Sequence, residues 1–261
     1  MNNVNKTLYI PLYGKAYVSR KGVILSDKKA EEIWDKEGFQ LKGKSKSKWL
    51  AYYMGMRAVV YDKWLSEQIN STENPVVLHI GCGMDSRCER VEKGDCLWYD
   101  VDFPDVIGER KKYYSESETY CMLSADARKT DWISTLPSKN AIVVLEGISM
   151  YFTHKEMKNL LKALNEHFDS VKVLMDCYTV KAAKASKYRN PINDVGVTGV
   201  WGTDSPSVYT EGTGLEFVCE HSMTPQYLTS QLKGAEGFVF RKLYGGAVAR
   251  TMYRMYEYKS E

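Results

Sequence analysis

Three acidic residues stand where short apolar runs of the sequence end, and their side chains could bind one ligand together. Asp102, Asp126 and Glu146 each follow a run of the kind that forms buried strands. If these runs are parallel strands of one sheet, their carboxyl ends meet at one edge, where open α/β sheets bind ligands. Carboxylates accept hydrogen bonds from hydroxyl and amino groups. The pattern therefore predicts a binding site for a small polar molecule.

A glycine-rich turn follows the first apolar run, with the sequence HIGCGMD at residues 79–85. Glycine lets a backbone turn sharply and approach a ligand closely. Asp102 lies 21 positions beyond Gly81 (102 − 81 = 21). At a spacing of about 20 residues, a carboxylate meets ribose hydroxyls in nucleotide sites. We therefore predict that Gly81 and Gly83 approach a cofactor whose ribose binds Asp102.

Two cofactor classes compete for this turn. A dinucleotide site requires a third glycine for close packing beside the pyrophosphate, but Ser86 stands at that position. S-adenosylmethionine (SAM) carries an ammonium, a carboxylate and a sulfonium, which suit the charged residues Asp85 and Arg87. We predict SAM, with Asp126 accepting from the adenine amino group and Glu146 holding the ammonium. A dinucleotide such as NAD, a turn without any ligand, and a helix-capping role for Asp126 are the alternatives.

The composition is that of an ordinary soluble globular protein. The 261 residues are 44% hydrophobic and carry a formal net charge of +3, from 36 basic and 33 acidic residues. A balance this close argues against nucleic acid or a membrane as the main partner. The run Lys42, Lys44, Lys46 and Lys48 fits a solvated surface better than a phosphate-binding patch.

The cysteines and histidines indicate a cytoplasmic protein without a metal site. None of the six cysteines lies in a C-x-x-C pair, and several fall within apolar runs, so we expect free buried thiols. The four histidines are scattered, without an HExxH motif or a Cys/His cluster. No signal peptide or membrane span is expected. The sequence leaves the oligomeric state open.

Apolar periodicity predicts an α/β fold, because short β-rich runs alternate with helical segments. The predicted strands cover 76–80, 96–101, 120–123, 141–145 and 171–176, and 250–258 could add an antiparallel one. The predicted helices cover 28–37, about 48–69 and 154–168, the last beginning with a capping box. We divide the chain into a helical region at 1–70 and an α/β domain at 71–261. The α/β domain contains a long loop or insertion around 184–214.

Three motifs resemble one known family. Residues 77–87 (VLHIGCGMDSR) look like its LGxGxDTR segment, residues 98–107 (WYDVDFPDVI) like its hydrophobic-acid-VD-F/L-P segment, and residues 146–151 (EGISMY) like its EGxxxY segment. The sequence resembles the leucine carboxyl methyltransferase superfamily, and above all its bacterial branch of tetracenomycin-type polyketide O-methyltransferases. Residues 12–16 and 26–30 extend the likeness over nearly the whole chain.

The resemblance implies a class I SAM-dependent methyltransferase fold. Such a fold has a seven-stranded, mostly parallel sheet whose last strand is antiparallel, here with a helical N-terminal lid. The resemblance further implies that Gly81 faces the cofactor backbone and that Asp102 binds the ribose. Asp126 with Ala127 would frame the adenine, and Glu146 would lie near the methionine end.

Two basic residues receive roles from the same resemblance. Arg57 would pair with the cofactor carboxylate, since a guanidinium can grip it at two points. Lys15 would lie in the lid at the same end, where the polyketide branch often has Arg. Ser86 replaces the usual Thr and keeps a hydroxyl. Beyond Trp201-Gly202, the loop 184–214 matches nothing in the family.

Methyl transfer from a sulfonium is an in-line displacement, so the protein must mainly hold nucleophile, methyl and sulfur collinear. A carboxylate acceptor needs no base, whereas a phenol benefits from one. Tyr151 and His154 are candidates for a catalytic role, although His154 fits the first turn of a helix better. The aromatic candidates for the substrate pocket are Tyr13, Tyr17, Tyr151, Tyr178 and Trp201.

We therefore expect an enzyme that transfers a methyl group from SAM to a carboxylate or hydroxyl of a small molecule, leaving S-adenosylhomocysteine (SAH). The acceptor would be polyketide-like or another secondary metabolite. The alternatives are carboxyl methylation of a protein C-terminus, an NAD-dependent dehydrogenase, and a SAM-binding protein without catalysis.

Overall fold

The computed structural model describes residues 8–41, 43–186 and 200–261, so Lys42 and part of the predicted insertion lie outside it. The strands are β1 (Val76–Ile80), β2 (Leu97–Asp102), β3 (Tyr120–Ser124), β4 (Asn140–Leu145), β5 (Ser170–Tyr178), β6 (Leu215–Glu220) and β7 (Tyr253–Ser260). The helices are α1 (Tyr9–Lys21), α2 (Lys28–Glu37), α3 (Lys48–Asn70), α4 (Arg87–Arg90), α5 (Pro104–Arg110), α6 (His154–His167), α7 (Val180–Ser186), α8 (Gln226–Thr229), α9 (Gly234–Leu243) and α10 (Gly246–Arg250). Short 3-10 helices are η2 (Gly43–Lys46), η3 (Asp131–Thr135), η4 (Ser149–Tyr151) and η6 (Pro206–Tyr209).

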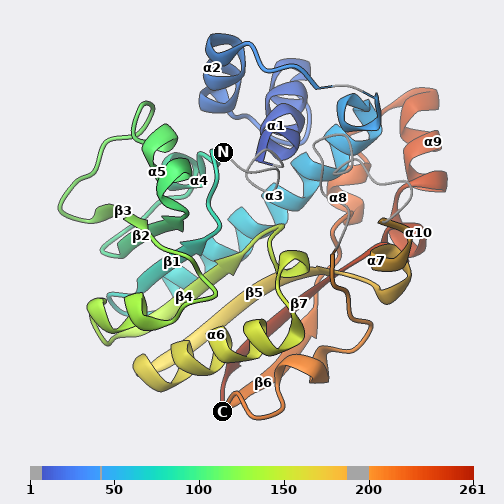
Figure 1. Cartoon of the computed structure of the whole chain (residues 1–261). Helices are drawn as coiled ribbons and strands as arrows, with labels where there is room; N and C mark the ends of the chain where they lie inside the picture. Colours follow the sequence, from blue (N-terminus) through green and yellow to red (C-terminus); the bar gives the residue numbers. More distant parts are fainter. Residues whose placement is uncertain (1–7, 42, 187–199) are drawn as a thin grey trace.

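All seven strands join one sheet in the order β3-β2-β1-β4-β5-β7-β6 (Figure 1). Strands β1 to β5 run parallel, whereas β7 is antiparallel to both β5 and β6. The strand order reverses direction at β1, between β2 and β4, and such a switch point opens a crevice at the carboxyl edge of the sheet. The predicted seven-stranded sheet with an antiparallel last strand is confirmed.

Helices cover both faces of the sheet, with α6 on one face and α3 on the other (Figure 1). Because side chains alternate along a strand, Val77 and Leu174 join the core under α3, whereas Leu78 and Val173 join the core under α6. Burial on both faces explains why β1 and β4 read as continuous apolar runs.

The amino-terminal helix α1 packs closely against α3 through two glycines. A Cβ on Gly14 would lie 2.7 Å from the Cβ of Met54, and one on Gly55 would lie 2.8 Å from a methyl of Val18. Further along α3, Trp64 belongs to the core under the sheet. Helix α3 therefore links α1 to the sheet, and the division near residue 70 stays a prediction.

The local predictions hold best where capping signals are strong. Helix α2 has its predicted bounds, and the Asp27 side chain accepts a hydrogen bond from Ala30 N. Helix α6 has the predicted capping box of Thr153 and Glu156. After the glycine turn comes α4, a helix of only four residues.

Strand β6 was missed because its side chains do not alternate in burial, as residues 216–218 are exposed at the sheet edge. All six cysteines fall within the described residues and are free, four of them buried. In the described part of the chain, no helix combines the length and apolar character that a membrane crossing requires.

Candidate functional site

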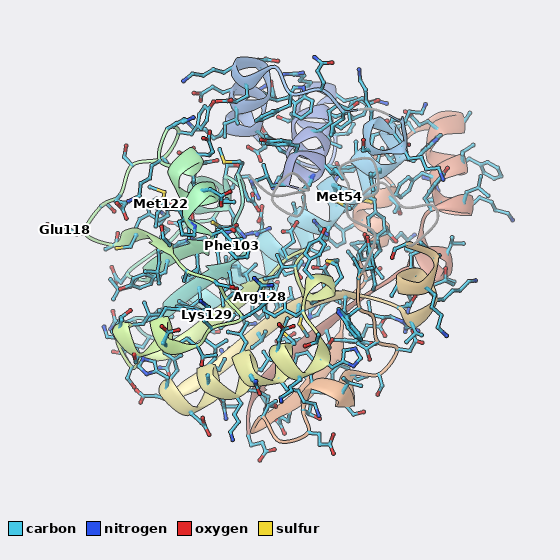
Figure 2. All side chains as sticks on the ribbon, viewed as in Figure 1. Met54, Phe103, Glu118, Met122, Arg128 and Lys129 are labelled. Atoms are coloured by element: carbon cyan, nitrogen blue, oxygen red, sulfur yellow. The ribbon has the colours of Figure 1, made fainter. Side chains whose placement is uncertain are left out.

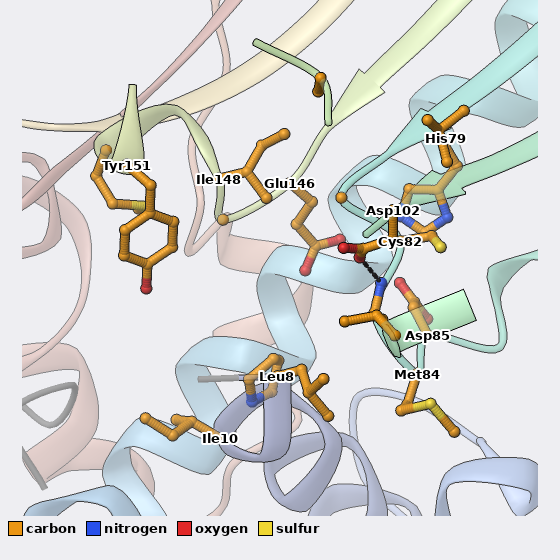
Figure 3. Close-up of a pocket in the computed structure, with 18 of the residues that line it drawn as sticks. Leu8, Ile10, His79, Cys82, Met84, Asp85, Asp102, Glu146, Ile148 and Tyr151 are labelled. Carbon is orange, nitrogen blue, oxygen red and sulfur yellow. Dashed lines mark hydrogen bonds between the residues drawn. The ribbon is translucent and has the colours of Figure 1, made fainter. Parts of the chain in front are cut away.

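The carboxyl ends of β1 to β4 border a cavity of about 250 Å³ (Figure 3). Most of the predicted site residues line it, although they come from distant parts of the chain. These are Lys15, Arg57, Gly81, Gly83, Asp102, Asp126, Ala127, Glu146, Tyr151 and Tyr178. The three strand-end carboxylates thus face one shared space, as the sequence pattern predicted.

The glycine turn needs its glycines for two different reasons. Gly81 and Gly83 have φ angles of 72° and 52°, a left-handed region that side chains disfavour. A Cβ on Gly81 would also lie 2.3 Å from a methyl of Ile148. The turn is anchored to β2, because Gly81 N donates to the Val101 carbonyl at 2.7 Å. This geometry brings bare backbone to the cavity wall.

Asp102 is held by backbone donors. Its carboxylate, which Figure 3 shows beside the glycine turn, accepts hydrogen bonds from Gly83 N and Phe103 N, both at 2.8 Å. Burial raises the pKa of Asp102 to about 6, although the two N–H groups and Arg110 lower it. Four lone-pair positions are available to a carboxylate, so this one retains capacity for further donors.

Glu146 lies in a different electrostatic setting. Its oxygens accept from Arg57 Nε at 3.0 Å and from Arg87 Nη2 at 2.5 Å. Burial alone would raise the pKa of Glu146, but Arg87 and Arg57 outweigh it and lower the pKa to about 2. Glu146 is therefore ionised throughout the physiological range.

The charges around Glu146 belong to a larger buried network. Arg87 also contacts Asp62 at 2.6 Å and Asp85 at 3.0 Å. Asp85 in turn pairs with Lys15 at 2.9 Å and with Arg90 at 2.8 Å. Despite burial, these cations hold the pKa of Asp85 well below its usual range.

Of Asp85 and Arg87, which we predicted to suit a zwitterionic ligand, Asp85 lines the cavity and Arg87 does not. The two side chains bind each other, and Arg87 is fully buried. Their pairing offsets the cost of burying the two charges. Lys15, which also lines the cavity, pairs with Asp85 as well.

Arg57 is also engaged within the protein. Its Nε contacts Glu146, and its Nη1 lies 3.2 Å from Asp176 Oδ2. Its guanidinium packs under Gly147, where a Cβ would meet Nη2 at 3.0 Å. The structure therefore gives Arg57 two carboxylate partners in addition to the cofactor carboxylate that the resemblance implied.

Asp176, a buried carboxylate that supports the site from outside the cavity lining, was overlooked in the sequence analysis. It ends the apolar run of β5, just as Asp102 and Glu146 end theirs, so the same signal would have found it. Tyr61 OH donates to it at 2.9 Å and Gly147 N at 2.6 Å. Burial raises its pKa even beside Arg57.

Asp126 lies nearer to solvent at another wall of the cavity. Arg128 binds both of its oxygens, with Nε at 2.9 Å and Nη2 at 2.8 Å. This hydrogen bonding lowers the pKa of Asp126. The Arg128 guanidinium also lies 5.6 Å from the centre of the Phe103 ring (Figure 2). Phe103 and Ala127 therefore provide apolar surface beside Asp126.

Of the aromatic candidates, only two line the cavity. Tyr151 and Tyr178 do so, and Figure 3 places Tyr151 across from the glycine turn. Tyr13 packs against Tyr17, with ring centres 5.9 Å apart, outside the cavity. Trp201 is 51% exposed. The predictions for Tyr13, Tyr17 and Trp201 are therefore not supported by their positions.

His154 is also outside the cavity. It begins α6 and its Nε2 lies 3.2 Å from the Gly202 carbonyl, so the first-turn interpretation is the correct one. The histidine that does line the cavity, among the described residues, is His79. Its Nε2 lies 3.2 Å from an Arg87 nitrogen, and burial lowers its pKa. His79 is thus buried between Arg87 and Asp100, whose Oδ1 lies 3.2 Å from its Nδ1.

The wall around Tyr151 is apolar and aromatic. Ile10, Met150 and Tyr253 line it together with Tyr151 and Tyr178. Tyr178 and Tyr253 stack edge to face, with ring centres 4.5 Å apart. Ile10 comes from α1, so the amino-terminal helices contribute directly to this side (Figure 3). The cavity therefore has a polar, carboxylate-lined part and an apolar part.

Comparison with known proteins identifies the family of this chain. The sequence model described as leucine carboxyl methyltransferase matches residues 6–165. The chain is 29% identical over 246 residues to the tetracenomycin polyketide synthesis O-methyltransferase TcmP of Streptomyces glaucescens, across 92% of this chain and 90% of that protein. It is 24% identical over 242 residues to the S-adenosyl-L-methionine-dependent methyltransferase dpfgK of Gibberella zeae, across 83% and 81%.

Solved structures with a similar fold include a methyltransferase and a cyclopropane synthase. Magnesium protoporphyrin IX methyltransferase (ChlM) from Synechocystis PCC 6803 with bound SAH gives a TM-score of 0.52 at 12% identity, over 95% of this chain and 98% of that one. The cyclopropane synthase MmaA2 from Mycobacterium tuberculosis gives 0.51 at 10% identity, over 77% and 82%. Identities this low show a shared fold alone.

Proposed function

Because the chain belongs to the leucine carboxyl methyltransferase family and is a SAM-dependent methyltransferase of the class I fold, we propose that it methylates an oxygen of a small molecule. The acceptor group is a carboxylate or a hydroxyl. The observation that carries this proposal is the two-part cavity, which joins strand-end carboxylates to an apolar, aromatic wall.

We place the cofactor along the polar part. Asp102 has spare acceptor positions for the ribose hydroxyls beside the glycine turn. Asp126 and Ala127, with Phe103 beside them, suit the adenine. Glu146 lies between these walls and the apolar part, where it can bind the ammonium of the methionine moiety. When bound, SAM supplies the electrophilic methyl group.

The acceptor would lie against the apolar wall of Ile10, Met150, Tyr151, Tyr178 and Tyr253. Aromatic side chains bury flat apolar molecules well. A relative with 29% identity is named for polyketide synthesis, which supports a polyketide-like acceptor or another secondary metabolite. The residues of this wall orient the nucleophile, and orientation is the main source of rate in a displacement of this kind.

The geometry offers little general base catalysis. His79 lines the cavity, but its Nε2 faces Arg87 and its Nδ1 faces Asp100, and His154 is outside the cavity. An acceptor that is already ionised, such as a carboxylate or an acidic phenol, needs no base. We therefore expect acidic acceptors to react faster than ordinary alcohols.

The experiment is transfer of a labelled methyl group from SAM to matched acceptors. One aromatic scaffold is tested with a free carboxylate, with a free phenol, and with both groups blocked, beside a peptide with a C-terminal leucine. We expect label on the carboxylate or phenol forms and none on the blocked form. Label on the peptide alone would favour protein carboxyl methylation. SAM binding without transfer to any of them would contradict the proposed acceptor class.

A pair of variants tests the apolar wall. Tyr151→Ala should raise the acceptor KM about tenfold and leave the SAM affinity unchanged, because Tyr151 lies across from the glycine turn. Trp201→Ala is the control, since Trp201 is an exposed aromatic residue outside the cavity. Equal effects of the two variants on KM would place the acceptor elsewhere.

A further inference from the structure

A second cluster of reactive side chains lies away from the cavity, at the β6–β7 edge of the sheet. Cys219 Sγ is 3.3 Å from His221 Nε2 and 3.5 Å from Glu257 Oε2. His221 Nε2 and Glu257 Oε2 are 2.6 Å apart. None of the three lines the cavity. The proposed methyltransferase function uses none of them.

The backbone brings these side chains to one face of the strand pair. Cys219 lies opposite Glu257 in the antiparallel register, after an irregularity between Phe217 and Cys219. A bulge of this kind re-aims the side chains that follow it. His221 is two positions further, and residues two apart share a face. The backbone N–H of His221 donates to the Met255 carbonyl at 2.8 Å, which fixes the end of β6.

The spacing of the three atoms approaches that of a tetrahedral zinc site. With Zn–S of about 2.3 Å and Zn–N or Zn–O of about 2.0–2.1 Å, tetrahedral angles give sulfur edges of about 3.5 Å. The observed sulfur edges are 3.3 and 3.5 Å. The nitrogen–oxygen edge should be about 3.3 Å, so only the 2.6 Å contact between His221 and Glu257 must lengthen.

The donor types select among metals. Thiolate and imidazole with one carboxylate are zinc ligands, whereas Ca²⁺ and Mg²⁺ prefer oxygen donors throughout. The His221 and Glu257 side chains are 27% and 13% exposed, so an ion can enter from solvent and keep a water. The sequence alone did not reveal these three ligands as a group, because Glu257 is far from Cys219 and His221 in the chain.

We propose that Cys219, His221 and Glu257 bind one Zn²⁺ ion, with water as the fourth ligand. The thiol proton of Cys219 is released to solvent when the Zn–S bond forms. The ion then joins β6 to β7, beside the ion pairs of Lys259 with Glu216 and of Arg254 with Glu220 that already cross this strand pair. Because the site requires the folded strand pair, binding stabilises the native state.

The test is metal titration of the full chain after removal of metals with a chelator. Co²⁺ serves as the spectroscopic probe, since a cobalt–thiolate bond gives a charge-transfer absorption in the near ultraviolet. We expect one equivalent of Co²⁺ to produce this absorption and Zn²⁺ to displace it. Zn²⁺ should also raise the melting temperature of the metal-free protein.

Two variants and a control locate the site. Cys219→Ser and His221→Ala should each weaken Zn²⁺ binding at least tenfold, and Cys219→Ser should abolish the absorption. Cys121→Ser is the matched control, because Cys121 is also a free, partly buried cysteine but lies on β3 at the other side of the sheet. Melting temperatures in excess chelator check that the variants fold as the wild type does.

Each result decides the proposal. Absence of Zn²⁺ binding at micromolar concentration in the wild type would overturn it. So would a charge-transfer absorption that survives Cys219→Ser or disappears in Cys121→Ser, since the sulfur ligand would then be another cysteine. Retained methyl transfer in Cys219→Ser is expected, because the cluster is outside the cavity.

Discussion

Asp102 and Glu146, two carboxylates that line the cavity, both stand at the ends of strands but have opposite electrostatics. Both end parallel strands of one sheet. Asp102 is held by two backbone N–H groups, and burial raises its pKa to about 6. Glu146 is held by two guanidiniums, which lower its pKa to about 2.

The difference indicates which ligand group each carboxylate can bind. A carboxylate without a cationic partner gains most from new hydrogen-bond donors, such as ribose hydroxyls, because part of its desolvation is uncompensated. A carboxylate already paired with arginines is fixed in position and charge, and it can accept an ammonium without moving. We therefore infer that ligand binding changes the pKa of Asp102, whereas Glu146 keeps its position and its charge.

The variant with the largest expected effect removes Arg87, a cation that pairs with Glu146. Arg87→Met should lower the free energy of unfolding by about 3–5 kcal/mol, because three carboxylates lose a buried partner. Chemical denaturation measures this. The control is Arg20→Met, which breaks an exposed pair with Asp35 and should cost less than about 1 kcal/mol. Similar losses in the two variants would show that the network does not stabilise the wall.

The next variant removes the carboxylate of Asp102. Asp102→Ala should weaken SAM binding at least tenfold, since the ribose hydroxyls lose their acceptor. Asp126→Ala should weaken it less than about threefold, because Asp126 already shares its oxygens with Arg128 near solvent. Isothermal titration with SAM and SAH gives both values. Wild-type affinity in Asp102→Ala would refute the ribose role.

The smallest expected effect is a dependence of SAM affinity on pH. Hydroxyls donate to the ionised form of Asp102, so binding should lower its pKa from about 6 and release a proton near that pH. Affinity should rise as the pH increases from 5 through about 6 and then level off. Glu146 stays ionised over this window because its pKa is about 2.

This pH dependence should vanish in one variant. Asp102→Asn cannot titrate, so its SAM affinity should be flat between about pH 5 and 7. Titration in two buffers of different ionisation enthalpy counts the protons released at each pH. A slope that persists in Asp102→Asn would assign the proton to another group.

Much of the fold was predictable, because it rests on local signals. Continuous apolar runs, the capping box at Thr153 and the glycine turn each encode one element, and those elements formed where expected. Strand β6 could not be predicted in this way. It has three exposed residues and gains its place by pairing with β7.

The candidate site was predictable only in part. Types and positions of residues at strand ends identified Asp102, Asp126 and Glu146, and all three line the cavity. The sequence could not show that Lys15 and Arg87 pair with Asp85. Nor could it show that Arg57 pairs with Glu146. Nor could the sequence show which of the aromatic candidates line the cavity.

The sequence by itself determined the element order, the glycine turn and the row of strand-end carboxylates, because these follow from backbone preferences and side-chain alternation over short distances. The tertiary structure alone decided which charges neutralise each other, since ion pairs join residues far apart in the chain. It thereby decided that Asp102 is free to respond to a ligand while Glu146 is held. It also brought Cys219, His221 and Glu257 within reach of one ion.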